Sequence, residues 1–218
     1  MNFANVASMK IPEGEVVKIT SGGVVLWELM SDGLPAGYTQ CEYLQLDGGQ
    51  CVDTEIVCDQ NSKIEMTFTR EDSSSRYLFG AESSGNTASF TGYQSGTSSG
   101  SWRFGAAYGR PSVTVNVKHT FTMDKDGIVM DGSRYRYNGT IGTFTTPQSL
   151  VVGTVHNTSG AIGTTLHIGK IYGFKLWDGD ELKAEYIPCK NPQGVYGFWD
   201  NVARKFRDSD GSSAFTGG

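Results

Sequence analysis

The sequence predicts an all-β sandwich, and three observations support this fold class. Short segments alternate apolar and polar residues with a period of two, which is the pattern of strands with one buried face. The chain has 29 glycines but only 6 prolines, which fits many tight turns between short strands. Charged residues make up 19% of its 218 residues, so it is long and apolar enough to bury a core as one domain with an appendage.

The first element is a short β-hairpin within residues 1–30. Its expected strands are Glu15–Thr20 and Val24–Glu28, joined by a Ser-Gly-Gly turn. A two-stranded hairpin is marginally stable alone in water, so its apolar side chains need a partner. We therefore expect docking or oligomerisation through Val24, Val25, Leu26 and Trp27. The alternative is an ordinary strand pair of the main domain.

Residues 31–37, SDGLPAG, have the composition of a turn and mark a linker before the main domain, residues 38–218. The opening strands of that domain are expected at Tyr38–Leu46 and Val52–Val57. The next strand, Lys63–Thr69, alternates regularly. It should point Ile64, Met66 and Phe68 inward and Lys63, Glu65, Thr67 and Thr69 outward.

Residues 82–101 are rich in Ser, Gly and Thr, with Phe90 and Tyr93 as the only anchors. A long polar loop on a rigid sandwich is a usual place for binding residues, but this segment also fits a simple connector or weak strands. Short strands are expected on either side, at Leu78–Ala81 and Trp102–Tyr108.

The segment Val113–Met123 has the clearest alternation in the chain and places His119 on its apolar face. A hydrogen-bonded core histidine is preferred there to a ligand or general base. Asp124–Gly127 then forms a hairpin turn. Its D-x-D-G pattern superficially resembles the start of a calcium loop, but the remaining ligands are missing, so we expect turn residues and neither metal nor cofactor.

The closing part of the domain is another hairpin. After a strand at Ser149–His156, the segment Ile168–Trp177 should direct Ile168, Tyr172, Phe174 and Leu176 to one face. An Asp-Gly-Asp turn leads into the return strand, on which Leu182, Ala184 and Tyr186 alternate with charged residues. Pro188, which lacks a backbone donor, is expected to end that strand.

Two stretches also resemble a known family. GKIYGFKLWDGDELKAEYIPCKNPQGVYGFWD and GYTQCEYLQLDGGQCVDTEI are similar to the closing and opening strands of laminin-G-like, concanavalin A-like jelly-roll domains of phage and prophage virion proteins. The stretch IPEGEVVKITSGGVVLW resembles amino-terminal segments of phage tail proteins. The resemblance implies a jelly-roll sandwich with an amino-terminal hairpin, located in the virion among other virion proteins. It also implies a homo-oligomer, such as a trimer.

Several function classes are disfavoured by the sequence. It has no E-x-D-x-x-E strand, G-x-S-x-G elbow, H-E-x-x-H helix or P-loop, so we expect no enzyme, with a carbohydrate-active enzyme as a remote alternative. A net charge of -5 without a basic run disfavours nucleic acid and anionic membranes as partners. MNFANVASMK lacks the apolar core of a signal peptide, so synthesis in a bacterial cytoplasm is expected, with four reduced cysteines.

The leading expectation is a tail- or fibre-associated protein that adheres to a host-surface glycan. The alternative is a protein that decorates a capsid or tail without binding a ligand. Sugar binding uses aromatic faces for the apolar side of a pyranose and polar groups for its hydroxyls. The candidate ligand-binding residues are Tyr93, Trp102, Arg103 and Tyr108 beside the polar segment, with Tyr135 and Tyr137 as a second patch. Each of these aromatics also fits a core or sheet-face position.

Overall fold

The computed structural model describes residues 18–21, 24–28, 33–96 and 100–218, with side chains from Gly33 onward. The regular secondary structure of these residues is almost entirely β-strand. The strands are β1 Lys18–Ser21, β2 Val24–Glu28, β3 Thr39–Gln40, β4 Leu44–Asp47, β5 Val52–Asp59, β6 Ser62–Thr69, β7 Arg76–Ala81, β8 Ser89–Gln94, β9 Ser101–Gly105, β10 Ala107–Gly109, β11 Lys118–Asp124, β12 Gly127–Met130, β13 Ser133–Tyr135, β14 Thr145–Val152, β15 Ile168–Asp178, β16 Glu181–Lys190, β17 Tyr196–Asp200, β18 Lys205–Arg207 and β19 Thr216–Gly217. A 3₁₀ turn, Ser84–Asn86, precedes β8.

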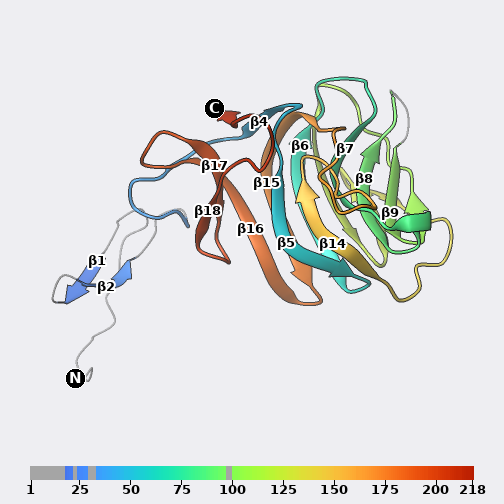
Figure 1. Ribbon diagram of the computed structural model, residues 1–218, viewed down its shortest axis with the longest axis horizontal. Helices are drawn as coiled ribbons and strands as arrows, with labels where there is room; N and C mark the ends of the chain where they lie inside the picture. Colours follow the sequence, from blue (N-terminus) through green and yellow to red (C-terminus); the bar gives the residue numbers. More distant parts are fainter. Residues whose placement is uncertain (1–17, 22–23, 29–32, 97–99) are drawn as a thin grey trace, which may run out of the picture.

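The strands form two large antiparallel sheets, which confirms the all-β class (Figure 1). The six-stranded sheet has the order β10-β9-β8-β7-β14-β5. The larger sheet runs β13-β12-β11-β6-β15-β16-β17-β18, with β3, β4 and β19 paired beside this path. Buried side chains of both sheets form one continuous hydrophobic core, so the two sheets pack face to face as a sandwich.

Aromatic residues join the two sheets at the centre of this core. The ring centroid of Phe121 of β11 lies 4.6 Å from that of Trp102 of β9, in an edge-to-face contact. The same ring stacks on Phe79 of β7 with a centroid distance of 5.6 Å. On β6, Ile64, Met66 and Phe68 are buried as predicted. Each of these side chains therefore lies on the inner face that period-two alternation assigns to it.

The inward face of β15 was predicted correctly only for its second half. Ile171, Phe174 and Leu176 are buried, whereas Tyr172 is half-exposed. The reason is a β-bulge: Ile171 and Gly173 oppose consecutive residues of β6, so Tyr172 is an extra residue. A bulge reverses the faces of all residues on one side of it, which moves Ile168 and Tyr172 off the inward face.

Pro188 does not end β16, which contradicts the prediction. The strand continues to Lys190 and pairs with both β17 and β3. The carbonyl of Pro188 accepts the Cys41 N–H at 2.9 Å, so the backbone polar groups of Pro188 point toward the β3 side. A residue in an antiparallel strand directs its N–H and C=O to the same side. The donor that Pro188 lacks would therefore point away from β17, and no hydrogen bond between β16 and β17 is lost.

The strand predicted at Val113–Met123 begins only at Lys118. Asn116 adopts a positive φ of 62°, and its N–H bonds to the Arg70 carbonyl at 2.7 Å, so the preceding residues form a turn. His119 is buried as expected, and Asp131 is its hydrogen-bonding carboxylate. Burial opposes ionisation of Asp131, but hydrogen bonds from His119 and the Thr120 N–H lower its pKa.

Two further boundaries differ from prediction. Among the alternatives for residues 82–101, the strand interpretation fits, because β8 occupies the centre of the six-stranded sheet. The strand predicted at Ser149–His156 runs instead from Thr145 to Val152. It stops there because Gly153 turns the chain with a φ of 91°, and a side chain at that position would clash with Leu46.

The amino-terminal hairpin is present as β1 and β2, which pair only with each other among the described strands. The side chains of Val24, Val25, Leu26 and Trp27 lie outside the described part of the structure. Within the predicted linker, Leu34 is 8% exposed and packs with Cys189 and Trp199 in a second small cluster. The chain is therefore packed into the sandwich from Leu34 onward.

Candidate functional site

The outer face of the six-stranded sheet brings together two tyrosines and two charged side chains. Tyr77 of β7 and Tyr93 of β8 are opposite each other, with ring centroids 4.7 Å apart and planes inclined by 48°. The Tyr77 hydroxyl donates a hydrogen bond to the Glu82 carboxylate. Arg103 of β9 lies on the same face, because it is two residues from Ser101, which pairs with Tyr93. We call Tyr77, Tyr93, Glu82 and Arg103 the tyrosine cluster.

The surroundings of Tyr77 within the tyrosine cluster keep its phenol protonated. Burial, the hydrogen bond to Glu82 and the charge of Glu82 all raise the pKa of Tyr77, and the nearby Arg103 opposes them. Tyr77 therefore remains a hydrogen-bond donor to Glu82 at neutral pH. The cluster thus presents a fixed aromatic pair flanked by one positive and one negative group.

The structure separates the first four candidate residues. Tyr93, Arg103 and Tyr108 lie on the outer face, since Tyr108 of β10 pairs directly with Arg103. The Tyr108 hydroxyl accepts a hydrogen bond from the Asn138 amide at 2.8 Å. Trp102 points the other way: its side chain is 0% exposed in the core, so it presents no face to a sugar.

The second candidate patch lies on the other sheet. Tyr135 and Tyr137, in and just after β13, are half-buried and pack against the core. Tyr137 contacts Phe104 at 5.7 Å and donates its hydroxyl to the Asp124 carbonyl at 2.8 Å. Its ring is thus anchored and forms part of the wall of a surface hollow.

Sequence reasoning missed Tyr77 and Glu82. Alternation along β7 would put Tyr77 and the core residue Phe79 on one face, but a bulge between them turns Tyr77 outward. Leu78 and Phe79 are consequently both buried. The apolar pair Leu78-Phe79 next to an aromatic residue was the only available signal of this irregularity.

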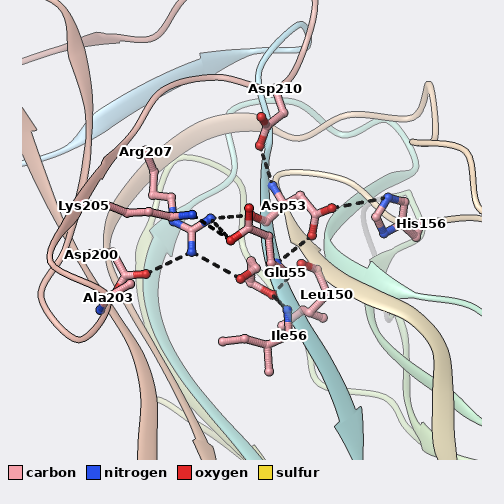
Figure 2. A network of polar contacts seen from close by, with 11 residues as sticks. Asp53, Glu55, Ile56, Leu150, His156, Asp200, Ala203, Lys205, Arg207 and Asp210 are labelled. Carbon is pink, nitrogen blue, oxygen red and sulfur yellow. Dashed lines mark hydrogen bonds and ion pairs between the residues drawn. The ribbon is translucent and has the colours of Figure 1, made fainter.

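A second polar assembly joins the edges of the two sheets (Figure 2). Arg207 of β18 contacts Asp200 at 3.2 Å and Glu55 at 2.9 Å, and Lys205 contacts Glu55 at 2.7 Å. Hydrogen bonds from Lys205 and Arg207 lower the pKa of Glu55. Asp210 also accepts the Asp53 N–H at 2.8 Å. These contacts fasten the β17–β18 hairpin to β5, and Glu55, Asp200, Lys205 and Arg207 each pair with an opposite charge, so we interpret the assembly as a structural clamp.

Beside this clamp, Ser149, His156 and Asp53 have the residue types of a hydrolytic triad but not its geometry. The Nδ1 atom of His156 lies 2.8 Å from the Ser149 carbonyl, to which it must donate, and 3.4 Å from the Ser149 hydroxyl. A nitrogen that carries this proton cannot accept one from serine. The Asp53 carboxylate lies 3.9 Å from Nε2 (Figure 2). The three residues therefore do not activate a serine nucleophile.

No group of three or more His, Cys, Asp and Glu side chains in the described residues is arranged to hold a metal ion. The four cysteines are free thiols, and burial raises the pKa of Cys51 to about 11. No helix in the described part of the chain is long and apolar enough to cross a membrane. Comparison with protein-family models gives no match, and comparison with curated proteins gives none either.

Proposed function

We propose that the chain is a non-enzymatic glycan-binding protein whose ligand surface is the tyrosine cluster. The observation that supports this proposal is the Tyr77–Tyr93 ring pair between Arg103 and Glu82 on an outer sheet face. Aromatic rings cover the apolar face of a pyranose, while a guanidinium donates to its hydroxyls and a carboxylate accepts from them. The cluster offers all three groups within one patch.

The scaffold also favours this proposal. Tyr77, Tyr93 and Arg103 lie on three hydrogen-bonded strands, so little conformational entropy is lost when a ligand orders them. Combined with the family resemblance, this arrangement fits a phage or prophage virion component that adheres to a host-surface glycan.

Replacing Tyr93 by alanine should weaken glycan binding at least about tenfold, because it removes one aromatic face and the support of the Tyr77 ring. Arg103→Gln should have a similar effect through lost charged hydrogen bonds. The measurement is the Kd of the full chain for polysaccharides extracted from candidate host cells, with and without a calcium chelator.

The matched control is Trp177→Ala, which removes a half-buried aromatic from β15 of the other sheet, where Trp177 stacks under Lys63. This variant should bind like the parent chain. Equal losses of glycan affinity in Trp177→Ala and Tyr93→Ala would contradict the proposal that the tyrosine cluster is the ligand surface. Saturable binding that the chelator abolishes would overturn the expectation of a metal-independent site.

A second function, docking into a larger assembly, is favoured by the hairpin. Strands β1 and β2 pair with no other described strand, and a two-stranded sheet of this size needs external packing. In this alternative the chain decorates a capsid or tail, or forms a homo-oligomer such as a trimer, through Val24, Val25, Leu26 and Trp27. Other virion proteins or further copies of the chain would then cover the hairpin.

The docking hypothesis predicts that Val25→Asp combined with Trp27→Asp converts an oligomeric full chain to a monomer, since two buried charges would oppose association. Light scattering after size-exclusion chromatography measures the mass. Glycan affinity per protomer should stay unchanged, because the tyrosine cluster lies within the sandwich. A parent chain that is already monomeric at high concentration would remove self-association from the hypothesis.

A further inference from the structure

A surface hollow of about 490 Å³ lies between the β11–β12 turn, β13 and the segment that follows β13. We call it the cationic hollow. Its lining includes Lys125, Arg134 and Arg136, with Asp126 as the single acidic residue and Tyr137 and Ile141 as apolar wall. Three positive side chains thus share one concave surface in a chain whose net charge is -5.

These three cations differ from the cations of the described part of the chain that form ion pairs. Lys118, Lys175 and Lys205 each pair with a carboxylate, and Arg76 and Arg207 do too. Within the residues that the structure describes, no carboxylate lies within ion-pair distance of Lys125, Arg134 or Arg136. Three positive side chains against the single negative charge of Asp126 give a local attractive field for anions.

Hydrogen bonds fix the walls of the cationic hollow. The Tyr137 hydroxyl donates to the Asp124 carbonyl at 2.8 Å, which ties the segment after β13 to the β11–β12 turn. The Asp124 carboxylate accepts the Asp126 N–H at 2.8 Å and closes that turn. The backbone that carries Lys125 and Arg136 is therefore held in place before any ligand arrives, which reduces the entropic cost of binding.

We propose that the cationic hollow binds the anionic group, a carboxylate or a sulfate, of an acidic glycan. The planar guanidinium groups of Arg134 and Arg136 suit bidentate contacts to either oxyanion, and Tyr137 and Ile141 offer an apolar wall to the sugar ring. The proposal rests on the glycan-binding function and specifies its ligand class. The Tyr108–Asn138 bridge connects the hollow with the edge of the six-stranded sheet, beside Arg103.

The test measures Kd values of the full chain for three probes: oligogalacturonate, its carboxyl-reduced neutral counterpart, and a single-stranded oligonucleotide of equal charge. We expect the acidic sugar to bind at least about tenfold more tightly than the neutral one, and the preference to shrink as salt is added. Arg134→Gln combined with Arg136→Gln should abolish the preference while neutral-sugar binding stays the same. The control, Lys63→Gln combined with Lys183→Gln, removes the same charge from other strands and should keep the preference.

Each outcome has a distinct meaning. If acidic and neutral sugars bind equally, or if the control pair loses the preference as fully as the arginine pair, the cationic hollow is not the site, although the glycan-binding function survives. If the folded chain binds neither these sugars nor the host polysaccharides, the glycan-binding function itself fails. Tighter binding of the oligonucleotide than of the acidic sugar would overturn the ligand class.

Discussion

Replacing Trp102 by alanine should lower the free energy of unfolding by about 3–5 kcal/mol, the usual loss for a fully buried large aromatic. The indole is 0% exposed and lies between the sheets, 4.6 Å from Phe121 and 5.6 Å from Phe79. Its removal would leave a cavity where the two sheets meet. Urea unfolding followed by far-UV circular dichroism measures the change.

Trp102→Phe provides the matched comparison. The Trp102 Nε1–H is buried and has no acceptor in the described part of the chain, so phenylalanine removes an unsatisfied donor as well as some apolar volume. The decrease in the free energy of unfolding should therefore be less than half as large in the phenylalanine variant as in the alanine variant. If Trp102→Ala unfolds within about 1 kcal/mol of the parent yet fails to bind glycan, Trp102 is a ligand residue after all.

The alternation of single strands could be predicted because it depends only on local geometry. Ile64, Met66 and Phe68 face inward since every second residue of an unbroken strand shares a face. The turns at Asp124–Gly127 and Asp178–Asp180 were also predictable, because glycine and aspartate suit those backbone conformations wherever they occur.

The irregular positions could not be predicted, since each depends on a partner strand. The bulge at Tyr172 exists only relative to β6, and Pro188 is tolerated only because its missing donor faces β3. Asn116 takes its positive φ where its N–H meets the Arg70 carbonyl, which is 46 residues away in the chain. No local pattern contains this information.

The same dependence on partner strands explains why the candidate site could be predicted only in part. Tyr93 and Arg103 were identified from their position beside a polar segment, and strand pairing places them on one outer face. Tyr77 joins them only because of a bulge in β7, and Trp102 points inward because its neighbour Arg103 points outward. Residue type alone does not distinguish an aromatic that packs the core from one that faces solvent.

Lowering the pH from 6.5 to 4 should cost the folded protein about 3 kcal/mol through His167 alone. Its imidazole is fully buried, and burial lowers its pKa from 6.5 to about 4. The Nε2–H donates to the Thr69 carbonyl at 2.8 Å, which leaves Nδ1 without a hydrogen-bond partner in the described residues. The hydrogen bond to Thr69 and the charge of Asp72 raise the pKa of His167, and the charges of Arg70 and Arg76 lower it, but burial is the largest of these effects and the pKa falls.

The direction follows from proton counting. Between pH 6.5 and 4 the unfolded chain binds a proton on His167 that the folded chain refuses, so unfolding becomes more favourable as the pH falls. Unfolding free energies measured in urea at several pH values should show this slope in the parent, and His167→Gln should make it much shallower, leaving the smaller contribution of carboxylates such as Asp131, whose pKa is also lowered. His156→Gln serves as the control, since it deletes a histidine from another part of the sandwich and should leave the slope in place. A His167→Gln variant with the same slope as the parent would mean that the acid sensitivity comes from other groups.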